Sequence, residues 1–170
     1  KIDSHIRQLD IFLNHLEDVK EISFVTYGSG ALILRKLLFF DAEWKKKIKL
    51  KKIIEINPPS NGSNFWKNMS KYSWAKKLFG PIIDDLTPHG VQKIPEYDKK
   101  LKVGIISANT LLIKLCEYLP NCIKKFLPFY EEYVHGDIKD VTKINSKTFF
   151  ILSGPDVASK CVKFLKQGEF

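Results

Sequence analysis

The chain has 170 residues, of which 44% are hydrophobic and 12% aromatic, so it is long enough for one core and its composition excludes a disordered protein. Its net charge of +9 comes almost entirely from lysine, because only Arg7 and Arg35 among the 28 basic residues are arginine. Arginine reads bases and clamps phosphates through paired hydrogen bonds, and few arginines are present. This composition favours a solvated lysine surface over a nucleic-acid or anionic-membrane surface.

Cysteine usage and hydropathy narrow the class further. The three cysteines, Cys116, Cys122 and Cys161, are odd in number and lack metal-ligand spacing, so neither a disulfide framework nor a zinc site is indicated. We also expect no other metal and no cofactor. No apolar run approaches the roughly 20 residues that cross a bilayer, and the N-terminus has no charged-then-apolar leader. We therefore expect a soluble, cytoplasmic protein without a transmembrane segment, although a leader preceding Lys1 would escape this argument.

The first half of the chain predicts two strands with helices around them. Apolar residues recur at spacings of three and four over about residues 3 to 17, which predicts an amphipathic helix. Residues 22–27 are β-branched and aromatic and predict a strand that stops at Gly28-Ser29-Gly30, with a helix over 31–38. The basic run 45–52 is expected on a solvated connection, and 53–57 predicts a second strand that two prolines close.

The second half predicts short helices, further strands and a final helix. Residues 64–100 show little alternation, which suits short helices over the end of a sheet. A strand is predicted at 102–109 and a helix at 111–119, while 141–145 and 147–152 could each be a strand. Pro155 at a first turn begins a helix that ends before Gly168. We expect a single α/β domain over 1–170, with an open, mostly parallel sheet and helices on both faces.

The glycine turn and five further segments carry a family resemblance. The turn lacks the complete glycine pattern and the Lys-Ser/Thr pair of phosphate-binding loops. Residues 24–35 instead resemble the lipase/esterase elbow F-V-T-H-S-x-G-G-x-x-x-R of the α/β-hydrolase superfamily, including its bacterial lipase-type members. The family segments A-P-P-N-x-G-S, F-G-P, V-G-x-I-A-G-N, S-H-T-F and F-L-x-x-G are matched in order by 56–63, 78–81, 103–109, 146–149 and 164–168. The resemblance implies an α/β-hydrolase fold with a small lid-like helical insertion at about 64–100.

Carried over position by position, the same resemblance implies a degenerate catalytic triad. The nucleophile position holds Gly28, which cannot attack a carbonyl, and the histidine position holds Lys147, a poor general base. The stretch expected to hold the acid contains no carboxylate before Glu131. An elbow nucleophile sits at strained, positive φ, which glycine adopts freely. We therefore expect a pseudoenzyme or a binding module for an acyl or ester small molecule, with pocket candidates Tyr27, Ser29, Trp66, Trp74 and Phe79.

Two alternatives stay open at this point. Ser29 could act as a shifted nucleophile of an active carboxylic-ester hydrolase, with His135 and Asp137 as base and acid, although such near neighbours rarely adopt triad geometry. The plainer interpretation of Ser29 is that its side chain caps the following helix. Alternatively, the lysine-rich surface could bind anionic lipid or nucleic acid, of which the composition disfavours nucleic acid.

The region upstream of the turn is short for this fold. About 27 residues precede Gly28, so the strands that usually flank the elbow strand have no room, and the fold is expected to be N-terminally truncated. Residues 22–27 would then form an apolar, unpaired sheet edge, which native proteins cover. We therefore expect another strand or subunit to cover this edge.

Overall fold

A computed structural model describes residues 2–108, 140–144 and 154–170 of the chain. The helix expected at 111–119 and the possible strand at 147–152 lie outside the described residues.

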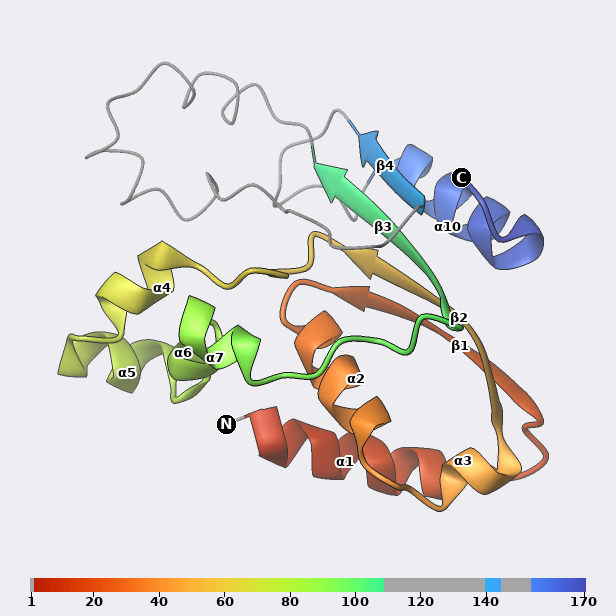
Figure 1. Cartoon of the computed structure of the whole chain (residues 1–170), viewed down its shortest axis with the longest axis horizontal. Helices are drawn as coiled ribbons and strands as arrows, with labels where there is room; N and C mark the ends of the chain where they lie inside the picture. Colours follow the sequence, from red (N-terminus) through yellow and green to blue (C-terminus); the bar gives the residue numbers. More distant parts are fainter. Residues whose placement is uncertain (1, 109–139, 145–153) are drawn as a thin grey trace.

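Four parallel strands form one sheet (Figure 1). They are β1 (Glu21–Tyr27), β2 (Lys49–Ile56), β3 (Lys102–Ala108) and β4 (Asp140–Ile144), in the spatial order β1-β2-β3-β4. Tyr27 pairs in register with Ile56, and Ile56 with Ile106, so the carboxyl ends of three strands meet at one edge. The predicted parallel sheet is confirmed, and β1 is its edge strand among the described residues.

Helices cover both faces of this sheet, as expected (Figure 1). On one face, α1 (Ile2–Asn14), α2 (Gly30–Phe39) and α3 (Trp44–Lys47) share a core with the inward side chains of β1 and β2. On the other face, α10 (Pro155–Gln167) packs through Phe164 on Ile54, Ile56 and Ile106. Pro155 begins this helix and Gly168 ends it at a φ of 86° in the left-handed region, where glycine is favoured.

The aromatic segment after β2 forms four short helices, as predicted. They are α4 (Asn64–Met69), α5 (Ser73–Phe79), α6 (Ile82–Asp85) and α7 (Pro88–Gln92). Two of them have side-chain caps, since Ser63 accepts a hydrogen bond from the Trp66 N–H and Thr87 accepts one from Gly90 at 3.0 Å. Within the residues that the structure describes, no helix is both long and apolar enough to span a bilayer.

The expectation that the basic run 45–52 is a solvated connection is wrong. Its first part ends α3, and β2 already begins at Lys49. Lys51 pairs with Glu21 of β1 at 2.9 Å. The ammonium group of Lys52 donates to the carbonyls of Phe164 and Leu165, at the C-terminal end of α10. A cation is stabilised at the negative end of a helix, so this lysine joins a strand to a helix on the opposite face from α2.

Candidate functional site

The turn after β1 has the sharp geometry that the resemblance predicts. Gly28 adopts a φ of +53°, its N–H donates to the Ile56 carbonyl at 2.9 Å, and its own carbonyl accepts from Ala31 at 3.2 Å. These two hydrogen bonds tie the turn to β2 on one side and to the start of α2 on the other. A β-carbon built on Gly28 would meet nothing within 4 Å, so the position is open and only its backbone conformation favours glycine.

Ser29 lies at the start of α2 but does not cap it. Its φ of −62° and ψ of −17° are already helical, and its side chain makes no capping hydrogen bond. Its backbone carbonyl accepts from Leu32 at 3.1 Å and from Ile33 at 3.2 Å. The predicted capping role is wrong because a capping side chain reaches back to the helix from an extended residue, which Ser29 is not.

The described histidines do not hydrogen-bond to Ser29. His5 lies exposed on α1, His15 lies exposed directly after it, and His89 lies exposed on α7. The Nδ1 atom of His15 is 2.7 Å from the Ile11 carbonyl of α1. His135, Asp137 and Lys147, the other residues expected at this site, lie outside the described residues, so their roles stay predictions.

The five pocket candidates fall into separate places. The rings of Trp66 and Phe79 meet edge to face, with centroids 5.3 Å apart, between α4 and α5. Trp74 lies instead against Tyr72, at 6.3 Å, and Tyr27 is exposed on β1. A cavity of about 700 Å³ lies among α1, α2, α4, α6 and α7, and one of about 320 Å³ lies between α1 and the end of α2. None of the five candidates lines either cavity.

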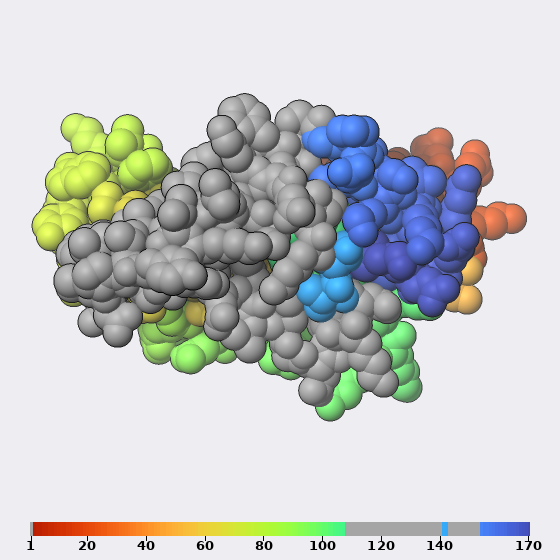
Figure 2. All heavy atoms as spheres, turned by 90° about the horizontal axis from the view of Figure 1, so that it is seen from above, coloured from red at the N-terminus to blue at the C-terminus, as the bar shows by residue number. Residues whose placement is uncertain are grey.

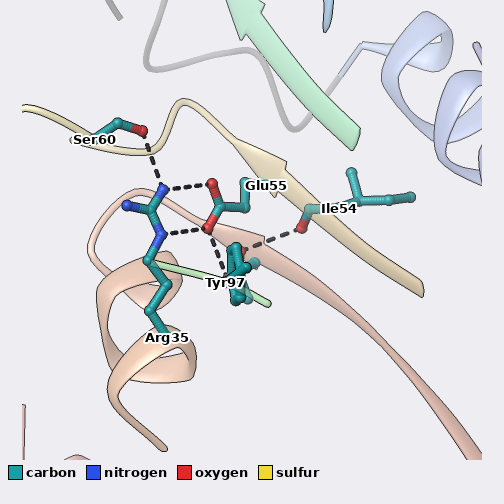
Figure 3. A network of polar contacts seen from close by, with 6 residues as sticks. Arg35, Ile54, Glu55, Ser60 and Tyr97 are labelled. Atoms are coloured by element: carbon teal, nitrogen blue, oxygen red, sulfur yellow. Dashed lines mark hydrogen bonds and ion pairs between the residues drawn. The ribbon is translucent and has the colours of Figure 1, made fainter. Parts of the chain in front are cut away.

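Beneath the turn, a buried ion pair connects α2 to β2 (Figure 3). Arg35 donates from Nε to Oε1 of Glu55 at 3.2 Å and from Nη2 to Oε2 at 2.9 Å. Nη2 also donates to the Ser60 hydroxyl at 3.2 Å, in the segment that follows β2. The Tyr97 hydroxyl donates to Glu55 Oε1 at 2.8 Å, and the guanidinium lies 5.3 Å from the centre of the Tyr97 ring. The Glu55 carboxylate thereby joins β2 to α2 and to the segment that holds Tyr97, and Arg35 adds the segment after β2.

Burial determines the electrostatics of this cluster. The Glu55 side chain is fully buried, so its charge is supported by the guanidinium and the hydroxyl rather than by water. Burial alone lowers the pKa of Arg35, and the adjacent Glu55 carboxylate outweighs it, so the net pKa is raised. Burial first and the Glu55 carboxylate second raise the pKa of Tyr97. The cluster thus joins the guanidinium of Arg35 and the hydroxyl of Tyr97 to the one carboxyl group of Glu55.

Sequence reasoning missed this cluster, although a signal for it existed. Glu55 is a lone carboxylate inside the apolar strand segment 53–56, and a buried carboxylate needs a partner. Arg35 is one of two arginines and matches the arginine of the elbow pattern. Nothing in the local sequence points to Tyr97, which lies 42 residues after Glu55.

The parallel sheet, its two helical layers and the sharp turn at its carboxyl edge define an α/β protein. No protein-family model and no curated protein matches the sequence. The crystal structure of the mature form of the lipase BlEst2 from Bacillus licheniformis is similar, with a TM-score of 0.49 and 11% identity, over 98% of this chain and 71% of that chain.

Proposed function

We propose that the protein is a lipase/esterase-like α/β-hydrolase-fold protein that has lost ester hydrolysis and works as a pseudoenzyme or binding module. The observation that carries this proposal is the glycine at the turn, which has the positive φ of an elbow and no nucleophilic group. The sequence places lysine at position 147, where the resemblance expects the histidine. A protonated lysine does not accept the proton that a serine nucleophile must lose.

The buried cluster supports a binding role for this site. Arg35, Glu55 and Tyr97 hold α2, β2 and the segment after α7 in fixed positions, independently of any nucleophile. A rigid frame favours ligand binding, because little conformational freedom is lost on association. The ligand we propose is an acyl or ester small molecule at the carboxyl edge of the sheet, near Trp66 and Phe79.

The test is hydrolysis of p-nitrophenyl esters of short and medium chain length by the purified full chain. We expect the same rate from the wild type and from the Ser29→Ala variant, equal to the rate in buffer. A rate that falls more than about tenfold on this substitution would show a functional serine nucleophile and remove the proposal. Binding is measured separately, as a shift of thermal unfolding with a medium-chain fatty acid, because a ligand of the folded state raises the unfolding temperature.

The second candidate is an active ester hydrolase that uses Ser29. It is favoured by one observation, the Ser29 hydroxyl at the carboxyl edge of β1 without a capping hydrogen bond. This candidate predicts that a fluorophosphonate probe labels Ser29 and that His135→Ala abolishes the labelling. Labelling of the wild type at the background level of the Ser29→Ala variant excludes it.

We also propose that a strand or subunit covers the outer edge of β1. We further propose that the protein works in a reducing compartment such as the cytoplasm. The edge proposal is supported by the place of β1 at the end of the strand order and by the exposure of Val25 on it. The compartment is supported by the free thiol of Cys161. Hydrogen exchange at the amides of Ser23 and Val25 tests the first of these, since a covering strand protects them and an open edge leaves them in fast exchange.

A further inference from the structure

One end of the molecule carries a group of large apolar side chains that face solvent. On α5, Trp74 is 57% exposed and Leu78 is 69% exposed. They are four residues apart, so they stand on the same side of the helix. Tyr72 lies against Trp74 and is also exposed, whereas Ala75 on the inner side is fully buried. This ridge, made of Tyr72, Trp74 and Leu78, is therefore the outer face of a helix whose inner face is packed.

The segment that carries the ridge is strongly basic. Residues 64–80 contain four lysines and neither aspartate nor glutamate. Lys76 pairs with Asp84 at 3.0 Å. Within the described part of the chain, Lys67, Lys71 and Lys77 are exposed and form no ion pair. Lys77 is three residues after Trp74 on the same helix, so its charge stands beside the ridge.

We propose that this surface docks the protein on an anionic lipid bilayer. Apolar side chains flanked by lysines fit the boundary of a bilayer, where rings and aliphatic groups enter the acyl region and ammonium groups meet anionic headgroups. Helix α5 has seven residues, roughly 10 Å, so it lies in the interface and does not cross it. The docking is separate from ester hydrolysis and goes beyond the proposed function.

The chemistry of the ridge favours lipid over nucleic acid or a second copy of the chain. Neither arginine lies in the segment, although arginine is the main residue that recognises phosphates and bases bidentately. Leu78 is the most exposed of the three ridge residues and has an aliphatic side chain, which gains by entering acyl chains and not by stacking on a base. A second copy would bring the same lysines face to face, and like charges repel.

The segment that carries the ridge lies at one end of the molecule. In Figures 1 and 2, α4 and α5 reach the left end of the molecule, and α10 lies at the right. A bilayer at this end contacts the ridge and leaves α10 in solvent.

The test is sedimentation of the full chain with vesicles of phosphatidylcholine alone or with about 30 mol% phosphatidylserine. We expect partitioning at least about tenfold stronger on the anionic vesicles, and weaker at high salt, because each lysine at such a surface contributes about a fivefold factor. The variant Trp74→Ser Leu78→Ser should lose at least about tenfold in partitioning. The variant Lys71→Gln Lys77→Gln should lose about 25-fold, which is two factors of five. All four residues are exposed, so both variants should unfold at the wild-type temperature.

Matched controls remove the same groups elsewhere. Ile11 and Phe12 are 58% and 60% exposed on α1, and Lys20 and Lys47 are exposed near α3. The variants Ile11→Ser Phe12→Ser and Lys20→Gln Lys47→Gln should partition within about twofold of the wild type. Equal losses in controls and ridge variants would mean that total charge or hydrophobicity matters and would overturn the proposal.

Three further outcomes also overturn it. The first is equal partitioning on neutral and anionic vesicles, and the second is no partitioning on either. The third is another partner in place of vesicles. This would be a wild-type dimer that dissociates in Trp74→Ser Leu78→Ser, or oligonucleotide binding that is abolished in Lys71→Gln Lys77→Gln. A second copy or a nucleic acid would then be the partner of this surface.

Discussion

Two glycines of positive φ differ in what surrounds them, and substituting each by alanine separates backbone strain from steric contact. Gly28 has a φ of +53° and Gly62 a φ of +68°. A β-carbon on Gly28 meets nothing within 4 Å, so Gly28→Ala should lower the free energy of unfolding only by the left-handed strain, about 1–2 kcal/mol. On Gly62 it would lie 2.5 Å from the backbone nitrogen of Pro88, and the forced shift adds about 1–3 kcal/mol.

The assay is urea unfolding followed by far-ultraviolet circular dichroism, with the free energy of unfolding extrapolated to water. We expect Gly62→Ala to be less stable than Gly28→Ala by at least about 1 kcal/mol. Equal losses of stability in Gly28→Ala and Gly62→Ala would refute the argument that the turn at Gly28 is sterically open. An unchanged stability of Gly28→Ala would refute its positive φ. Gly28→Ser should match Gly28→Ala in stability, and a gain of ester hydrolysis in Gly28→Ser would contradict the proposal that the other catalytic groups are missing.

Three further substitutions test contacts between elements, each by urea unfolding. Arg35→Met should lower the free energy of unfolding by about 3–5 kcal/mol, because it leaves the Glu55 charge buried and unpaired. The double variant Arg35→Met Glu55→Leu should recover most of this stability, and no recovery would show that the broken ion pair is not the cause. Lys52→Gln should cost about 1 kcal/mol through the lost cation at the end of α10, and an unchanged midpoint would count against that contact. Gly104→Ala would place a β-carbon 2.6 Å from the Phe164 ring and should cost about 1–3 kcal/mol; a stabilised variant would mean that α10 does not pack there.

The fold was predictable wherever its signals are local. The β-branched residues 22–27 and the glycines after them predicted β1 and the turn, and Pro155 and Gly168 predicted both ends of α10. The start of β2 was missed because lysines are rare in strand interiors. Lys52 is tolerated there because it reaches the carbonyls at the end of α10, about 113 residues away in sequence. A contact of that range leaves no periodicity in the sequence.

The candidate site was predictable in its backbone and not in its side chains. The glycine at the turn required only a local conformational argument, and the observed φ confirms it. The capping role of Ser29 failed because capping depends on the dihedral angles of that single residue, which composition does not specify. The pairing of Arg35, Glu55 and Tyr97 depends on three elements meeting in space, so no window of sequence contains it.

The turn is maintained by forces that do not involve a nucleophile. Its N–H is bonded to the Ile56 carbonyl of the neighbouring strand, and its carbonyl accepts the first hydrogen bond that leads into α2. Behind it, Arg35 holds α2 on β2 through the fully buried Glu55. These contacts use backbone groups and a buried ion pair, so a serine at position 28 would add strain without adding a bond that the fold needs. Glycine at this position therefore avoids that strain and leaves the frame intact, so the sharp turn needs no nucleophile to persist.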